Sequence, residues 1–175
     1  MPTFNTDTVH GLSADVYFDS VARRVFGDVV WSTTLENLDL TANDEGNINP
    51  VDTLRRGDVT RVTVPLSDAL GLPTLSGVIF PFATSVTGDS GVEVHLPKAS
   101  PGDSFLTQAK ELRLVARDGS FTLIAAKAAP VELGDIVMSE ENQMVAPVTF
   151  QLYRTTISGV ETPYRLISGS VITGP

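Results

Sequence analysis

The strongest candidate for catalytic chemistry is the tetrapeptide Gly88-Asp89-Ser90-Gly91. One class of serine proteases carries this pattern around its nucleophile, where a histidine base and an aspartate partner converge on the serine. Val92 stands where that motif continues with glycine, and His10, the only upstream histidine, lies near the chain end. Gly, Asp and Ser between two strands are also typical of a tight turn. We therefore favour a turn here, with Ser90 as a turn residue.

A second candidate is a cation site in the acidic segment around Gly46. Aligning this glycine with that of a calcium loop places Asn43, Glu45 and Asp52 at ligand positions. Thr41 then stands at the first position, which requires a carboxylate, and no flanking helices are predicted. The two histidines are far apart in the sequence, and the chain has no cysteine. We expect neither a metal nor a cofactor.

The remaining acids and aromatics give no better catalytic signal. The pairs Glu140-Glu141 and Asp44-Glu45 are adjacent residues, which point to opposite faces if they lie on a strand. Trp31, the only tryptophan, is better suited to a core or interface than to stacking on a ligand. No phosphate-binding loop, dinucleotide fingerprint or nucleophile elbow occurs. The chain is therefore not expected to be an enzyme.

The size and charge of the chain limit the remaining classes of function. The chain has 175 residues, with Lys+Arg 12 against Asp+Glu 21 and a formal net charge of −9. This length predicts one domain over residues 1–175. The acid excess argues against a protein that grips nucleic acid phosphates. The N-terminus shows no secretory signal, and the apolar run Gly77–Ala83 is too short to cross a membrane, so we expect a soluble chain.

Alternation of apolar and polar residues is the dominant structural signal. It predicts half-buried antiparallel strands, and hence a mainly β sandwich or barrel. The apolar members of the clearest stretches are Val62, Val64 and Leu66; Leu112, Leu114 and Ala116; and Val148, Phe150 and Leu152. Further strands are expected at 15–18, 21–26, 29–40, 92–96, 121–125 and 164–172. A short helix is expected over Asp68–Leu72 and another turn or two over Ser104–Lys110.

The polar segment Asn37–Gly57 interrupts two β-prone runs and is predicted to be a long loop or an extended hairpin. From Gly27 to Leu54 the chain has six acids and no Lys or Arg, and then Arg55 and Arg56 follow together. Such separation of acidic from basic residues suits the pairing of an acidic face on one subunit with a basic face on another. A solvated loop on a monomer remains an equally open interpretation.

Several sequence motifs follow one another in a distinctive order. A long strand at 29–40 precedes the acidic loop and then the stretch PVDTLRRGDVTRVTVPL at 50–66. Further along come ELRLV at 111–115, an Asp-Gly-Ser turn at 118–120, KAAPV at 127–131 and VAPVTF at 145–150. In the order and spacing of these motifs, roughly residues 15–153 resemble the major tail tube proteins of long-tailed, siphovirus-like bacteriophages.

The resemblance implies a sandwich or barrel of the tail-tube type with one short flanking helix and a long extended loop. It implies hexameric rings that stack into a hollow tube, through which DNA passes without specific binding. Residues 1–13 would be a flexible arm, 37–57 the stacking loop and 154–175 a C-terminal extension. The candidate contacts between rings are Asp39, Asp44, Glu45, Asp52, Arg55 and Arg56.

The same resemblance implies the partners and the location. The chain would bind itself, a tape measure protein inside the tube, and tail terminator and distal tail proteins at its ends. It would reside in the virion tail after assembly in the cytoplasm of the bacterial host. The alternatives are a tail terminator or head-tail joining protein, which forms one ring, and a monomeric β-sandwich binding or adhesion module.

Overall fold

A computed structural model describes residues 3–41, 50–67, 82, 84–88, 91–95, 102–138 and 144–169. The chain is mainly β, as predicted. Its strands are β1 (Thr3–Leu12), β2 (Ala14–Phe18), β3 (Val21–Arg23), β4 (Val29–Thr41), β5 (Pro50–Leu66), β6 (Thr84–Gly88), β7 (Gly91–His95), β8 (Lys110–Ala116), β9 (Phe121–Leu133), β10 (Val137–Met138), β11 (Met144–Leu152), β12 (Thr155–Ile157), β13 (Val160–Thr162) and β14 (Arg165–Ser168).

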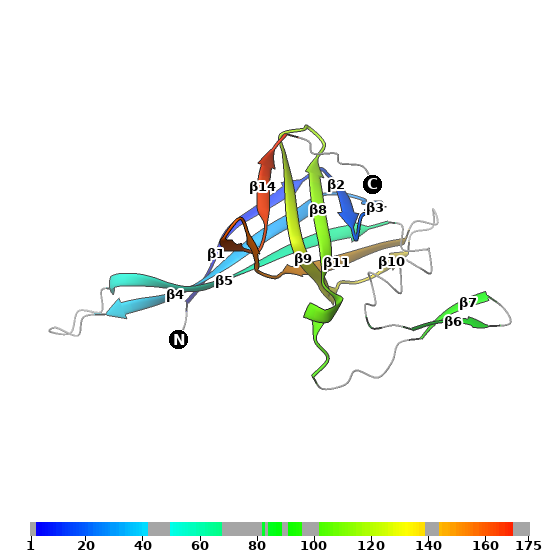
Figure 1. Ribbon diagram of the computed structural model, residues 1–175, viewed down its shortest axis with the longest axis horizontal. Helices are drawn as coiled ribbons and strands as arrows, with labels where there is room; N and C mark the ends of the chain where they lie inside the picture. The colour runs from blue at the N-terminus through cyan, green and yellow to red at the C-terminus, as the bar shows by residue number, and fades with distance from the viewer. Residues whose placement is uncertain are drawn as a thin grey trace.

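One large antiparallel sheet contains most of these strands, in the order β1-β4-β5-β11-β9-β8-β2-β3. In addition, β10 pairs with β11, and β14 pairs with β9. The strands β6 and β7 form one separate hairpin, and β12 and β13 form another. In Figure 1 the strands β1, β4, β5 and β11 run across the molecule, whereas β2, β8, β9 and β14 stand upright.

Strand β9 is where the sheet divides into these two groups. Along one edge it pairs with β8; along the other it pairs first with β14, at Phe121–Ile124, and then with β11, at Ala128–Leu133. A register shift in the β8–β9 ladder, between Lys110–Ala128 and Leu112–Ala125, lies at this change. Bulges bend a strand and increase its twist. The bend lets the two groups face one another across a shared core, which makes a sandwich plausible.

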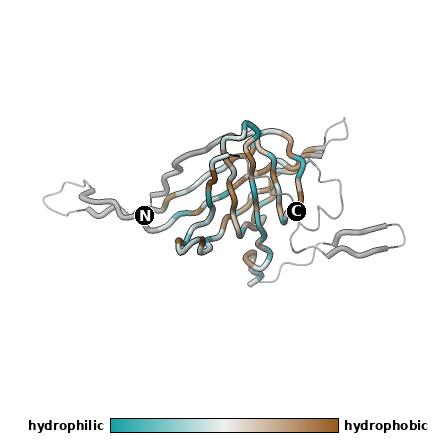
Figure 2. Tube along the Cα trace, turned by 45° about the horizontal axis from the view of Figure 1, so that its top comes forward, coloured by the Kyte–Doolittle hydropathy of each residue, from teal (hydrophilic) through white to brown (hydrophobic). Residues whose placement is uncertain are grey.

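The core lies between the two groups and follows the predicted alternation. The three predicted apolar series on β5, β8 and β11 are all buried. Phe150 of β11 contacts Phe18 of β2, with ring centroids 5.0 Å apart. The hydrophobic positions of Figure 2 are concentrated in these strands. Burial of one face of each strand therefore sets the register, because a shift by one residue would expose the whole apolar series.

The chain between β3 and β4 runs from one group of strands to the other. β3 pairs with β2, whereas Val25 forms an isolated bridge with Leu66, and the Phe26 N–H donates to the Pro65 carbonyl at 2.9 Å. Gly27, with φ of 105°, provides the bend that follows. These contacts form no continuous ladder, so the sheet is not a closed barrel.

Residues 3–12, expected within a flexible arm, instead form β1 and pair with β4. At β1, backbone pairing with another strand overrides a polar local sequence. Residues 37–57, expected to be a long loop or an extended hairpin, form an extended hairpin in their described part, because β4 continues to Thr41 and β5 begins at Pro50. Within the expected C-terminal extension, β14 lies inside the strand expected at 164–172 and pairs with β9.

Helix is sparse in the described residues. The segment expected at Ser104–Lys110 contains a single 3₁₀ turn, Phe105–Gln108, whereas Asp68–Leu72 lies outside the described residues. The Phe105 ring contacts that of Phe82 edge-on, with centroids 5.1 Å apart. In the part of the chain that the structure describes, no helix is long and apolar enough to cross a membrane.

Candidate functional site

The feature that stands out from the sheet is the far end of the β4–β5 hairpin. The two strands pair from Val30–Thr63 to Thr41–Pro50, and the register shifts between Glu36 and Asn37. Glu36 is opposite Gly57 and Asn37 opposite Arg55, which leaves Arg56 as an extra residue in a bulge. We call the paired residues 37–41 and 50–55, beyond this bulge, the arm. Figure 1 shows the arm projecting away from the rest of the sheet.

The neighbouring strands stop where the arm begins. On one side, β1 pairs with β4 only as far as Thr3 opposite Asn37. On the other side, β11 pairs with β5 only as far as Leu152 opposite Thr60. Among the described residues the arm is therefore a two-stranded ribbon with an open backbone edge on each side. Such edges readily accept another strand, and an isolated hairpin is at best marginally stable.

The structure brings four of the six predicted contact residues onto this hairpin. Asp39 lies on β4; Asp52, Arg55 and Arg56 lie on β5. The backbone register places Asp39 opposite Thr53 and Asp52 opposite Leu40, so the two acids lie on adjacent pairs of the ladder. Asp44 and Glu45 lie outside the described residues.

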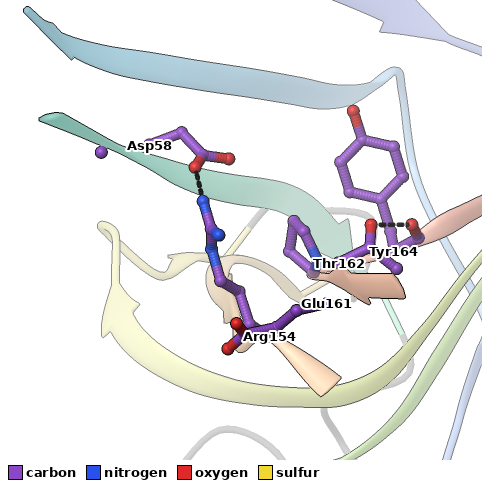
Figure 3. Close-up of a pocket in the computed structure, with 7 residues that line it drawn as sticks. Asp58, Arg154, Glu161, Thr162 and Tyr164 are labelled. Atoms are coloured by element: carbon purple, nitrogen blue, oxygen red, sulfur yellow. Dashed lines mark hydrogen bonds and ion pairs between the residues drawn. The ribbon is translucent and has the colours of Figure 1, made fainter. Parts of the chain in front are cut away.

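An open pocket of about 550 Å³ lies at the base of the arm. Gly57 and Asp58 line it from β5, Arg154 from the segment after β11, and Glu161–Tyr164 from β13 and the residues that follow. Figure 3 shows these side chains converging from three segments of the chain. The pocket therefore lies where the pairing of β11 with β5 has ended and the β12–β13 hairpin begins.

The Arg154 guanidinium donates to the Asp58 carboxylate in this pocket. The Asp58 side chain is only 8% exposed, whereas the Arg154 side chain is 45% exposed. A charge-assisted hydrogen bond of this kind is stronger than one between neutral groups. Just before Arg154 in the chain, burial raises the pKa of the Tyr153 phenol.

The other wall of the pocket is held by local contacts. The Thr162 hydroxyl donates to the Tyr164 carbonyl at 2.6 Å, and the Tyr164 ring meets Trp31 of β4 edge-on, with centroids 5.0 Å apart. Trp31 thus acts as a packing residue, as its size suggested. Among the described residues, the pocket lining includes two carboxylates and one guanidinium but no histidine, serine or cysteine. The charged groups of the pocket suit ion pairing.

The outer face of the crossing strands carries polar residues beside apolar ones such as Val59, which is 43% exposed. On this face Thr63 of β5 and Thr149 of β11 are directly opposite, with their hydroxyl oxygens 3.0 Å apart. Gln151 lies opposite Arg61, and Glu132 opposite Thr149. Hydroxyl and amide groups thus surround one base and one acid on this part of the face.

The residues considered for catalysis or metal binding do not converge among the described residues. Gly88 and Gly91 pair at the end of the β6–β7 hairpin, which agrees with the turn interpretation, although Ser90 itself lies outside the described residues. His10 lies on β1 opposite Trp31, and His95 lies on β7 opposite Thr84. No group of three His, Cys, Asp or Glu residues able to hold a metal occurs in the described part of the chain. Glu140-Glu141, Asn43 and Glu45 also lie outside it.

Sequence reasoning missed the pocket entirely. Asp58 and Arg154 are 96 positions apart. Asp58 lies in the stretch 50–66 quoted above and Arg154 follows β11, and nothing in the local sequence of either residue indicates that the two meet. Charged residues at such positions usually face water. No known family model matches the chain, and no curated protein matches its sequence.

Proposed function

We propose that the chain is a structural subunit of a phage tail tube, which forms rings that stack through the β4–β5 arm. The observation that supports this best is the two-stranded arm with open edges, projecting from a folded antiparallel sheet. We expect the open edges of such a two-stranded ribbon to pair with another chain in the assembled protein. A neighbouring ring of the same chain is the covering partner that this function supplies.

Edges within the sheet supply a second set of contacts for the ring itself. The ladder order leaves β1 and β3 at the two ends of the large sheet, each with one described partner strand. Pairing between such edges in neighbouring copies would remove the aggregation hazard that they pose. A contact that closes into a ring and also repeats along an axis produces a tube.

The charge distribution suits a conduit for DNA. The chain carries a net charge of −9, and the outer face of β5 and β11 presents hydroxyl and amide groups around Arg61 and Glu132. Tight binding of DNA requires clustered Lys and Arg that replace counterions on the phosphates. A lumen lined by such a face would let DNA pass without gripping it. In this role the protein would be a non-enzymatic component of the virion.

Electron microscopy of the purified protein at rising concentration tests the proposal. We expect stacked tubes about 10 nm wide, the size of a ring of several domains each a few nanometres across. Single rings that never stack would favour the terminator or joining role. A species that stays monomeric at high concentration would favour a binding or adhesion module and refute ring formation.

The arm itself is tested by shortening it. In the first variant, residues 38–54 are replaced by an Asn-Gly turn that joins Asn37 to Arg55, which are already paired. A milder variant lacks only Asp44–Asn49. The matched control carries a Ser158→Asn change in the turn of the β12–β13 hairpin, away from the arm. We expect folded subunits in all three and normal tubes only from the control; tubes of normal length from the shortened variants would refute the role of the arm.

A further inference from the structure

We infer that the Asp58–Arg154 ion pair is a clamp that holds the base of the arm against the body of the sheet and thereby sets the arm's direction. The clamp is a property of the single subunit. Its importance for assembly rests on the proposed stacking function.

The pair lies where the β5–β11 ladder would continue. That ladder ends with Leu152 opposite Thr60, and the same register would place Arg154 directly opposite Asp58. The segment after β11 still pairs with β9, since the Tyr153 N–H donates to the Lys127 carbonyl at 2.8 Å in the β9–β11 register. A side-chain contact thus connects the two segments at the position where the backbone ladder has ended.

Among the described residues, the other supports of the arm end near the same place. The β4–β5 register breaks just beyond Glu36–Gly57, and β1 reaches only to Asn37 within the described residues. A bulge permits a local change of bend and twist, and a glycine adds little resistance to it. The direction of the arm therefore depends on whatever fixes β5 at residues 57 and 58.

The two side chains of the pair differ in burial. The Asp58 side chain is 8% exposed and belongs to the strand that continues into the arm, whereas Arg154 reaches it from the side of the open pocket. A hydrogen bond between a guanidinium and a carboxylate is stronger than one between neutral groups. The pair thus favours one arrangement of β5 relative to the segment after β11.

Hydrogen exchange on the unassembled protein, at concentrations below ring formation, measures the clamp directly. Arg154→Gln should raise the exchange rate of amides in the arm about tenfold, while amides of β8 stay within about twofold of the original, because only a local opening is made easier. Asp58→Asn should act in the same way. The double variant should match the single ones, since both changes remove the same interaction.

The matched control is Arg117→Gln, which breaks the ion pair with Asp15 on the other group of strands, where both side chains are more than half exposed. It should leave arm exchange unchanged. Unchanged arm exchange in both Arg154→Gln and Asp58→Asn would overturn the clamp. An equal rise in the arm and in β8 would also overturn it, because the pair would then stabilise the whole fold.

Microscopy of the same variants separates the clamp from the proposed function. If arm exchange responds to the substitutions as expected but the unsubstituted protein forms no tubes, the clamp exists and the stacking function is refuted. Wild-type tubes that become shorter or rarer in Arg154→Gln, but not in Arg117→Gln, support both. Normal tubes from a variant with a released arm would mean that stacking does not depend on the clamp.

Discussion

Replacing Phe150 with alanine tests the central packing arrangement of the two strand groups. Phe150 is 1% exposed on β11, and its ring contacts that of Phe18 on β2. Loss of a buried phenylalanine costs about 3 to 5 kcal/mol, through lost burial and the cavity left behind. This is a large part of the roughly 5 to 15 kcal/mol by which a domain is usually stable. The melting temperature should fall by roughly 10 °C.

The neighbouring residue Gln151 supplies the control. It lies on the opposite face of the same strand, opposite Arg61 of β5, and is partly exposed. Gln151→Ala should change the free energy of unfolding by no more than about 0.5 kcal/mol. Urea unfolding of both variants, followed by circular dichroism, gives the two values under identical conditions. Equal losses, or a larger loss for Gln151→Ala, would refute the assigned core face of β11.

Three further predictions concern turns. Ser20 lies in the two-residue turn between β2 and β3 and has a φ of 64°, a conformation that glycine tolerates better. Ser20→Gly should therefore increase the free energy of unfolding by roughly 0.5 kcal/mol and raise the urea midpoint. A lower midpoint would contradict this. Gly27→Ala should cost about 1 to 3 kcal/mol in calorimetry, from backbone strain at its φ of 105°, because the added Cβ would be 3.8 Å from Pro65 and would not clash. The Ser120 hydroxyl and N–H bind the Asp118 carboxylate at 2.7 and 2.9 Å and hold the pKa of that carboxyl below its ordinary value. The resulting stabilisation is present above about pH 4 and is lost as the pH falls through the lowered pKa. Carboxyl NMR titration of Ser120→Ala should show a higher Asp118 pKa than in the unchanged chain.

The strands of the core were predictable because their signal is local. One apolar face repeated every second residue is required for burial, and β5, β8 and β11 show it plainly. The turn at Asp118-Gly119 was predictable for the same reason, since glycine there adopts a positive φ of 73°. The turn at Asp19-Ser20 was not, because neither residue is glycine although both have positive φ.

The strand at residues 3–12 was not predicted. β1 is polar, and its propensity alone does not distinguish it from a loop; it forms because β4 offers a backbone partner. β14 lies within the strand predicted at 164–172, but its pairing with β9 could not be recognised from its local sequence. For residues 37–57 the local sequence was compatible with a loop or an extended hairpin, and the pairing of β4 with β5 selects the hairpin.

The sequence alone was sufficient to establish that the chain is mainly β, which faces of its central strands are buried, and that its acids are segregated from the pair Arg55 and Arg56. These properties follow from residue type and spacing, which act over a few positions. The tertiary structure alone decided that β9 pairs with both strand groups, that the arm has no neighbouring strand beyond Asn37 and Thr60 among the described residues, and that Arg154 contacts Asp58. Each of these depends on contacts between residues distant in the chain, and such contacts exist only once the strands have paired and the sheet has bent.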